Sequence, residues 1–551
     1  MTATLQITRH MVTVKGARQV HYRRAGSGPP VVILHQSPTS SAEYIPLIQE
    51  LAKEFTVFAP DTPGNGMSDP LPDLEAPKME DFADAVADLL DALGLGKVPL
   101  YGFHTGGICA LALGLRHPDR TSVAIMDGYM QMEAAERDDF LKHYLPAFVP
   151  DWSGAHLTWA WSRFREQSIF FPWYRKDAAA RIPRDLPSPE QLHWSVMEFF
   201  RAGDAYRRAY RPPFVFDCAQ AVTNVKANMV VMTARTDVLD RYVDKMPPVP
   251  QNVRVLRPQD KPAAQAALAE IFRTQARGVA PPIAGATPMP GRIWADYLQV
   301  DGGSLYARRN TDGQGRPIVF VHASAGSSFA MDRFMEPFIG QHPVLAVDLP
   351  GNGESDNPMG AELTVAAQAK YLAQAIRAAG YPEVDCYGHW GGAAVAIEFA
   401  AQNGGMVKNL AIPNVMMPEG ADLAELLANY TPAFEPDPAG THLIKAWHMV
   451  RDQELFAPWY KRDKAHAIKN VDSAQLAPEV IHRRTVDLFK MGDLYRAAYA
   501  AHFTYPAAQR LKDTRCRVLF GAVDDAATKQ GLAAVGTRGV VGQSLAAFFA
   551  G

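Results

Sequence analysis

The sequence contains an internal repeat at a spacing of about 286 residues. Eleven of the twenty-one positions are identical between residues 154–174 and 440–460. Two shorter segments recur in the same order, namely VVILHQ (31–36) as IVFVHA (318–323) and DTPGNGMSD (61–69) as DLPGNGESD (348–356). Self-similarity of this kind indicates a duplicated structural unit. The chain of 551 residues is also longer than the roughly 250–300 residues at which a single hydrophobic core stops growing, so we predict two domains of like fold.

A segment without periodicity separates the two copies. Residues 279–291 (VAPPIAGATPMPG) are rich in Pro, Gly and Ala, a composition typical of a semi-rigid linker. We therefore expect a first domain over residues 1–278 and a second over residues 292–551, with a shortened C-terminus in the second.

Each copy alternates short apolar runs with helix-length amphipathic segments. In the first copy the apolar runs are PPVVILH (29–35), EFTVFAPD (54–61), VPLYGF (98–103), TSVAIMD (121–127) and NMVVMTA (228–234). The segment MEDFADAVADLLDAL (79–93) has the i, i+3, i+4 spacing of a helix. This alternation predicts an α/β fold with a mostly parallel, doubly wound sheet in each copy. Segments rich in Trp, Arg and Tyr predict helical caps at about 130–215 and 416–505.

Charge and hydropathy argue against several classes of partner. Lys and Arg (55) nearly balance Asp and Glu (58), and no long run of one sign could follow a phosphate backbone. The N-terminus lacks an apolar signal region, and no stretch approaches the ~18 apolar residues of a membrane helix. We therefore expect a cytoplasmic protein without nucleic-acid or membrane partners. Its two domains are expected to pack on each other, with a homodimer as a further possibility.

The cysteine pattern bears on metals and redox state. The four cysteines form no CxxC pair and are far apart in sequence: Cys109, Cys218, Cys386 and Cys516. This spacing suggests neither a disulfide framework nor a thiolate zinc site, and it suits a reducing compartment. No other motif points to a metal or a cofactor. We expect a cofactor-free protein that binds a small molecule.

Each copy contains a glycine-flanked turn between a predicted strand and a predicted helix. The first turn is YGFHTGG (101–107) and the second is YGHWGG (387–392). Together with the DxPGxGxSD stretch and the histidine-containing loop before it, this pattern resembles the nucleophile elbow of the α/β hydrolases. The resemblance covers nearly all of both copies and implies an α/β-hydrolase-like domain with a helical cap in each.

The central residue of the elbow departs from the family pattern. It is His104 in the first copy and Trp390 in the second, where the family has serine, cysteine or aspartate. The family's histidine follows the last strand, but no histidine is present at that place in the first copy. We expect the second copy to be too short at its C-terminus for the usual last strand and histidine loop. A Ser-His-Asp relay needs all three groups, so the degenerate elbows argue against that mechanism.

Acidic residues match the family pattern better. The family's acid usually follows the strand after the cap, which corresponds to Asp237 in the first copy and to Asp524 or Asp525 in the second. Asp127, at the end of the strand that follows the elbow, is another candidate. Either Asp237 or Asp127 would orient His104.

His104 is the candidate catalytic base. An imidazole, with an unperturbed pKa of ~6.5, exchanges protons near neutral pH without any serine. The resemblance implies that the backbone N–H groups of Gln36 and Thr105 form an oxyanion hole. The alternative is a decayed elbow without chemistry.

Four further residues are candidate substrate contacts: His35, His156, Trp161 and Arg165. His35 matches the family's loop histidine, which usually orients the loop by hydrogen bonding. One helical turn separates Trp161 from Arg165, so indole and guanidinium could both face the pocket. The alternatives are a buried Trp161 and a local ion pair of Arg165 with Glu166.

These residues favour an enzyme of the α/β-hydrolase superfamily that is not a Ser-His-Asp esterase. His104 would support hydrolysis by an activated water, or proton abstraction leading to C–C cleavage or isomerisation, of a small apolar or aromatic substrate. Trp390 can neither accept a proton nor attack, so the second copy is expected to be inert, with the indole filling its cavity. The alternative is a non-catalytic pseudoenzyme that serves as a ligand-binding or scaffold protein.

Overall fold

The computed structural model describes residues 6–72, 76–360, 362–521 and 526–550. Contacts within the chain divide it into two compact units. The first unit comprises Met1–Val149, His156–Thr287 and Pro438–Gly440, and the second comprises Pro150–Ala155, Pro288–Asp437 and Thr441–Gly551. The passage from Thr287 to Pro288 falls inside the Pro- and Gly-rich segment 279–291.

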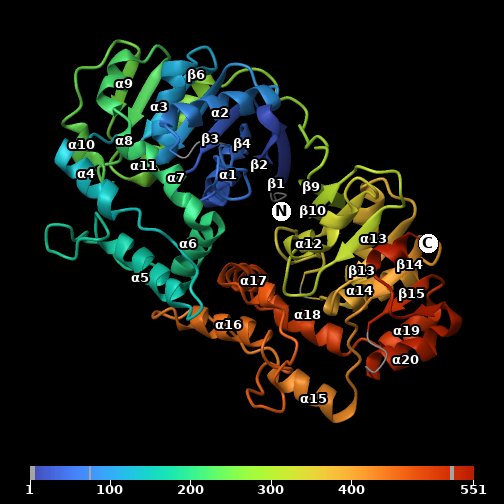
Figure 1. Cartoon of the computed structure of the whole chain (residues 1–551). Coiled ribbons are helices and arrows are strands. Elements are labelled where there is room, and N and C mark those ends of the chain that lie inside the picture. Colours follow the sequence, from blue (N-terminus) through green and yellow to red (C-terminus); the bar gives the residue numbers. More distant parts are fainter. Residues whose placement is uncertain (1–5, 73–75, 361, 522–525, 551) are drawn as a thin grey trace. The chain divides into compact units, whose positions relative to one another are not determined.

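The first unit is built on an eight-stranded sheet (Figure 1). Its strands are β1 (Thr8–Val14), β2 (Arg18–Ala25), β3 (Pro30–Leu34), β4 (Thr56–Pro60), β5 (Val98–Phe103), β6 (Thr121–Asp127), β7 (Met229–Met232) and β8 (Val253–Leu256). Their order is β1-β2-β4-β3-β5-β6-β7-β8. The β1–β2 and β2–β4 pairs are antiparallel, and all other neighbours are parallel. The five predicted apolar runs form β3 to β7, which confirms the α/β fold class.

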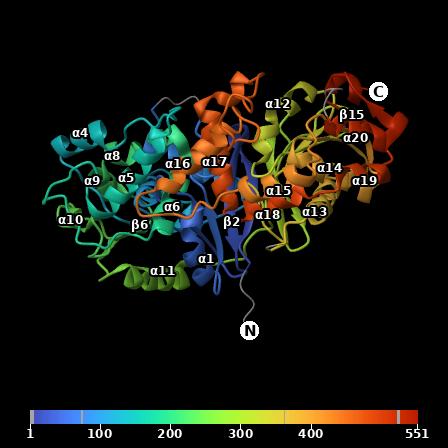
Figure 2. The ribbon, with the colours of Figure 1, turned by 90° about the horizontal axis from the view of Figure 1, so that it is seen from below.

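Helices cover both faces of this sheet, because β3 to β7 are apolar on both sides. One core lies between the sheet and α2 (Met79–Ala92), α3 (Thr105–Arg116) and α9 (Cys218–Asn224). A second core lies between the opposite face and α1 (Ile45–Leu51) and α11 (Lys261–Gln275). Figure 2 shows α1 and α11 on the same side of the sheet. The predicted helix 79–93 is α2.

The cap of the first unit lies between β6 and β7 in the chain. Its helices are α4 (Ala134–His143), α5 (Ala155–Ile169), α6 (Pro189–Ala202), α7 (Tyr206–Tyr210) and α8 (Pro212–Val215). Aromatic side chains hold them together, with Phe199 at the centre of contacts to Phe148, Phe164 and Tyr206. Aromatic rings bury a large apolar area on few rotatable bonds, which suits a cap without a sheet beneath each helix.

The second unit repeats the architecture of the first. Its sheet has the order β16-β15-β14-β13-β11-β12-β10-β9, which is the same topology. The strands are β9 (Trp294–Val300), β10 (Gly303–Asn310), β11 (Ile318–Val321), β12 (Val344–Val347), β13 (Val384–Gly388), β14 (Val407–Ile412), β15 (Arg517–Phe520) and β16 (Gly539–Val540). We expected the C-terminus to be too short for a last strand, and this expectation was wrong. The last strand is present, but it has only two residues.

The helices of the second unit follow the same pattern. The faces of the sheet are covered by α12 (Asp332–Met335), α13 (Val365–Ala378), α14 (Gly391–Gln402), α19 (Ala507–Asp513), α20 (Ala526–Val535) and α21 (Leu545–Phe549). Its cap consists of α15 (Gly420–Asn429), α16 (Thr441–Asp452), α17 (Pro478–Met491) and α18 (Leu494–Phe503). No helix in the described parts of the chain is long and apolar enough to cross a bilayer.

Candidate active site

The turn between β5 and α3 holds His104 in a strained conformation. Its φ is 46° and its ψ is −110°, a region that L residues rarely adopt. Glycine is required on both sides of the turn: a Cβ on Gly102 would lie 2.0 Å from the Gly106 carbonyl oxygen, and one on Gly106 would lie 2.3 Å from that of Leu34. This strained conformation projects the imidazole from the carboxyl edge of the sheet.

Strand register brings three candidate residues to that edge. Phe103 pairs with Asp127 across β5 and β6, and Asp127 pairs with Met232 across β6 and β7. His104 follows β5, and Asp237 lies in the loop after β7. Because the carboxyl ends of parallel strands meet at one edge, residues 133 positions apart become neighbours.

His104 is hydrogen-bonded to Asp237. Its Nε2 lies 3.1 Å from Oδ2 and 3.2 Å from Oδ1 of that carboxylate, with 25% and 15% of the two side chains exposed. The Leu239 backbone N–H donates to Asp237 Oδ1 at 2.8 Å and fixes the carboxylate. A carboxylate can only accept, so Nε2 is the donor, and Nδ1 is the basic nitrogen of the neutral ring.

The two pKa values move so as to favour the charged pair. Burial lowers the pKa of His104, but the charge and hydrogen bond of Asp237 outweigh it, and the net shift is upward. Burial raises the pKa of Asp237, but the His104 charge and hydrogen bond reverse this, and the net shift is downward. The imidazolium formed by taking up a proton is therefore stabilised at this place.

Asp127 lies at the same edge but does not orient the ring. Its Oδ2 accepts a hydrogen bond from the Tyr101 hydroxyl at 2.9 Å. Its link to His104 is through the backbone, since the His104 N–H donates to the Asp127 carbonyl oxygen at 2.7 Å. Burial raises the pKa of the Asp127 carboxyl to about 6. Of the two acids considered for orienting His104, the structure places Asp237 in contact with the imidazole.

The loop after β3 is held by His35. Its Nε2 accepts from the Thr62 backbone N–H at 2.9 Å, so its Nδ1 donates to the Gln36 carbonyl oxygen at 2.7 Å. His35 is buried and does not line the cavity, so the structure does not support its assignment as a substrate contact. Gln36 and Thr105 both line it. Thr105 is the first residue of α3, where backbone N–H groups lack helical partners.

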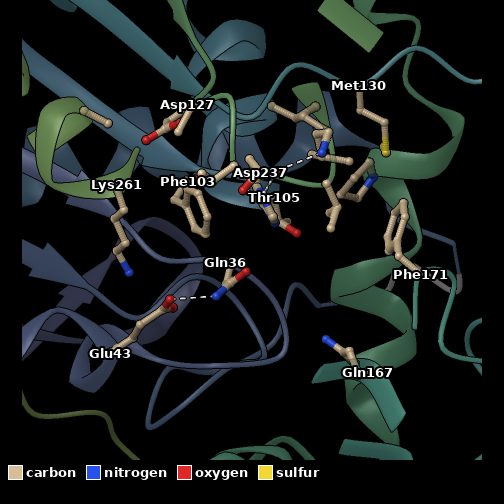
Figure 3. A pocket seen from close by; sticks show the side chains of 18 of the residues that line it. Gln36, Glu43, Phe103, Thr105, Asp127, Met130, Gln167, Phe171, Asp237 and Lys261 are labelled. Carbon is tan, nitrogen blue, oxygen red and sulfur yellow. Dashed lines mark hydrogen bonds and ion pairs between the residues drawn. The ribbon is translucent and has the colours of Figure 1, made fainter. Parts of the chain in front are cut away.

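A cavity of about 620 Å³ opens in front of His104. Figure 3 shows Lys261, Asp127 and Glu43 on one side of it, and Met130, Phe171 and Gln167 on the other. Glu43 accepts a hydrogen bond from the Gln36 side chain at 2.6 Å. The aromatic side is completed by residues of the cap, namely Tyr144, Tyr210 and Phe214. The cavity therefore has a polar side and an aromatic side, with His104 accessible to both.

The other candidate contacts from the cap do not reach this cavity. His156 is buried and packs edge-on against Phe148, and Trp161 is buried in α5. Arg165 pairs with Glu166 at 2.8 Å. None of these three residues lines the cavity. Trp161 and Arg165 lie on other faces of α5 than its lining residue Gln167, whereas His156 lies about three turns away from Gln167 along the helix. Identity of Gln167 with Gln453 in the repeat was the sequence signal that could have singled out this residue.

The second copy has a different site. Trp390 adopts the same strained turn, with φ 48° and ψ −118°, but 48% of its side chain is exposed. The expectation that the indole fills the cavity was wrong, because nearly half of this residue is exposed to solvent. The buried His502 ring lies instead against Gly391, where a Cβ would approach its Nδ1 to 2.4 Å. The predicted acids Asp524 and Asp525 lie outside the described residues.

Metal binding has no candidate centre in the part of the chain that the structure describes. No group of three or more His, Cys, Asp or Glu side chains comes together there.

A second cavity of about 420 Å³ in the second unit is lined by Tyr387, His389 and Asn414, among others. His389 is half-buried, and the partial burial of its ring lowers its pKa to about 4.

Comparison with known proteins identifies the fold family. The model described as alpha/beta hydrolase fold matches residues 29–204 and 316–478. The chain is 32% identical over 148 residues to an uncharacterised hydrolase of Saccharomyces cerevisiae. This alignment covers 26% of this chain and 50% of the yeast protein. It is 41% identical over 106 residues to a soluble epoxide hydrolase of Corynebacterium sp., covering 19% and 36%. It is 28% identical over 122 residues to (E)-2-((N-methylformamido)methylene)succinate hydrolase of Acinetobacter baylyi, covering 22% and 46%.

Solved structures show similarity to single copies. A hydrolase from Pseudomonas aeruginosa matches with a TM-score of 0.36 and 16% identity, over 50% of this chain and 97% of that one. Epoxide hydrolase A from Mycobacterium thermoresistibile matches with a TM-score of 0.38 and 18% identity, over 50% and 100%. The chain spans about half or less of the length of the curated relatives named above. The family model matches more than half of the chain in two successive regions, and the chain therefore belongs to the alpha/beta hydrolase fold family as a tandem of two such domains.

Proposed function

We propose that the first domain is a hydrolase in which His104 acts as the general base and no serine takes part. The observation behind this proposal is the contact of 3.1 Å between His104 and Asp237 at the strained turn, facing a cavity of about 620 Å³. A cavity of this size suits a small organic molecule. The named relatives are hydrolases, which favours hydrolysis over the other reactions of a general base.

The proposed reaction uses the two ring nitrogens differently. Nε2 donates to Asp237, and Nδ1 has no hydrogen-bond partner among the described residues. A water held at Nδ1 would lose a proton to it while its oxygen attacks an ester or acyl carbon. The imidazolium so formed is stabilised by Asp237 and returns the proton to the leaving group. The backbone N–H groups of Gln36 and Thr105 would stabilise the negative charge on the substrate oxygen.

The same base could instead remove a proton from the substrate. Proton abstraction would lead to C–C cleavage or isomerisation, with the same imidazolium as the intermediate acid. The products distinguish these reactions, because only hydrolysis incorporates oxygen from solvent water. Reaction in H₂¹⁸O should therefore label the acid product if the proposed hydrolysis is correct.

A non-catalytic role is the second candidate, and it applies to the second domain. Its elbow residue Trp390 has no group that can exchange a proton, and His502 packs directly against the turn. We propose that this domain serves binding or packing and does not contribute a catalytic base.

The central experiment replaces His104 by Gln, which keeps a polar side chain but removes the base. Turnover of a panel of small esters and amides should fall by about 10²–10⁴. A matched control is His117→Gln, because His117 forms a surface pair with Asp84 in the same domain at 2.7 Å. The proposal fails if His104→Gln retains the activity of the unchanged protein while a serine-directed inhibitor abolishes it.

A further inference from the structure

The cap of the first domain buries an arginine without an acidic partner. Arg163 lies in α5 with 1% of its surface exposed. Its Nη1 donates to Gln167 Oε1 at 3.1 Å, whereas Nε and Nη2 have no hydrogen-bond partner among the residues that the structure describes. No acidic side chain within the described ranges forms an ion pair with it. Burying a charge without a counter-charge is strongly unfavourable, so this arrangement requires an explanation.

Aromatic rings compensate the charge only in part. The central guanidinium carbon lies 4.9 Å from the ring centre of Phe164, 5.2 Å from that of Trp173, 5.4 Å from that of Phe199 and 5.7 Å from that of Tyr206. Ring faces attract a cation, but they do not replace the hydrogen-bond acceptors that the in-plane N–H groups require. Two donors of a positively charged group thus remain unsatisfied.

The unsatisfied edge of Arg163 has the geometry that binds a carboxylate. The groups Nε–H and Nη2–H point the same way and form the fork that donates to both oxygens of a carboxylate. Other arginines of this chain use the same edge: Arg116 holds Asp84, Arg257 holds Asp240, Arg273 holds Glu54 and Arg308 holds Asp332. In Arg163 this edge has no partner in the described parts of the chain.

Arg163 is hydrogen-bonded to a residue that lines the cavity. Gln167, its single hydrogen-bond partner in the described structure, lines that cavity beside Phe171 (Figure 3). Tyr144 lines it as well, and burial raises its pKa while the nearby Arg163 charge opposes that rise. A rotation of the half-buried Gln167 side chain would connect the guanidinium with the cavity.

The second copy shows that the fold does not need this arginine. The position that corresponds to Arg163 in the repeat is Met449 in α16, which is also 1% exposed. The corresponding glutamine, Gln453, accepts instead from Arg484, which pairs with Glu454. The buried cation is therefore specific to the copy whose elbow holds His104.

We propose that Arg163 and Gln167 form an anion subsite that binds the carboxylate of a small organic acid in the first domain. The aromatic side of the cavity would hold the apolar body of that acid. Placing the reacting group at His104 rests on the proposed function, whereas the binding of the carboxylate does not. Water can satisfy the two N–H groups but cannot neutralise the charge, which is why an anionic occupant fits this position.

The test compares acids with their uncharged amides. Benzoate, phenylacetate and 3-phenylpropionate are each paired with the corresponding amide, and binding to the full chain is measured by titration calorimetry. At least one acid should bind about 10- to 100-fold more tightly than its amide, as expected for hydrogen bonds to a charged group. Equal affinities within all three pairs, or no binding of any acid, would overturn the proposal.

Variants assign the preference to the subsite. Arg163→Met, which installs the residue that the second copy has here, should abolish the preference for the acid over its amide. Arg175→Met removes an exposed cap arginine that pairs with Asp177, and it should keep the preference. If Arg163→Met does not fold, Arg163→Gln provides the same comparison, because it also removes the charge and the fork but keeps a polar side chain in the cap. An unchanged preference in the folded Arg163 variant would overturn the proposal.

Two further readouts separate this proposal from the proposed function. His104→Gln should keep the preference for the acid. Loss of turnover in this variant without loss of the preference supports both the role of His104 and the anion subsite. Retained turnover in His104→Gln, with the preference lost in Arg163→Met, contradicts only the role of His104. Without ligand, the melting temperature of Arg163→Met should equal or exceed that of the unchanged protein, because an uncompensated buried charge has been removed. A lower melting temperature together with an unchanged preference would show a purely structural role.

Discussion

Replacing His104 by Gln and Asp237 by Asn, singly and together, measures how strongly these two side chains interact in the folded first domain. The double-mutant cycle isolates the pairwise free energy from the other effects of each substitution. It requires no substrate, so it tests the geometry of the site before any activity is known.

The structure sets the expected magnitude of this interaction. Exposed ion pairs contribute about 0.2–1 kcal/mol, and hydrogen bonds to charged groups contribute about 1.5–3 kcal/mol. The His104 and Asp237 side chains are mostly buried, and their contact is short at 3.1 Å. We therefore expect a coupling free energy of about 1.5–3 kcal/mol when both groups are charged.

The pH dependence follows from the directions of the two pKa shifts. The pKa of His104 is raised above its ordinary value of 6.5, so its contribution is complete below pH 6.5 and is lost as pH rises through the folded-state value. The pKa of Asp237 is lowered below its ordinary value of 3.8, so its contribution is lost only as pH falls through that lower folded-state value. Coupling should be greatest between about pH 5 and 6.5 and should fall to about 1 kcal/mol or less at pH 9.

Urea-induced unfolding at pH 6 and pH 9 provides the measurement. The transition that moves with the substitutions belongs to the first domain, and its midpoint gives the free energy of unfolding. A control cycle on His117 and Asp84, a more exposed pair, should give less than about 1 kcal/mol at both pH values. The reasoning is refuted if the His104–Asp237 coupling is below about 0.5 kcal/mol at pH 6, or if it is the same at pH 9.

Three further predictions concern the elbows and the linker. Trp390→Ala should lower the free energy of unfolding by only about 1–2 kcal/mol, because truncating a half-exposed indole costs less than the ~3–5 kcal/mol of truncating a buried one. A larger loss of stability in a calorimetric melt would contradict the exposed position of Trp390. A fluorophosphonate probe followed by peptide mass spectrometry should find no adduct on either elbow or on the buried Ser37 and Ser324, and a stoichiometric adduct on either serine would restore a serine mechanism. Limited proteolysis with subtilisin should cut first within residues 279–291, where Val279 is almost fully exposed, and should leave two compact halves. First cuts confined to the caps would argue against a linker there.

Local sequence patterns were sufficient to predict the fold. Strands β3 to β7 are continuous apolar runs because helices cover both faces of the sheet, and this pattern depends only on neighbouring residues. The first glycine of each turn, Gly102 or Gly388, is required by backbone contacts within about five residues, so the elbows were also visible in the sequence. The hairpin of β1 and β2 was not predicted, because its strands contain several Arg and His residues and lack an apolar run.

The partners within the site depended on tertiary structure. Asp127 and Asp237 were equivalent candidates in the sequence, and strand register together with the loop after β7 placed only Asp237 at the imidazole. Helical periodicity showed which residues of α5 share a face, but the packing of the cap decided that Gln167 lines the cavity while Arg165 does not.

The sequence by itself determined the duplication, the α/β fold and the absence of an elbow serine, because each depends on residue identity and short-range periodicity. Only the tertiary structure decided that Trp390 is half exposed and that Arg163 is buried without an acid. Hydropathy predicts the opposite for both residues. Burial is set by which segments pack around a side chain, and the packing of the cap encloses Arg163 with rings from α5, α6, α7 and the segment after α5.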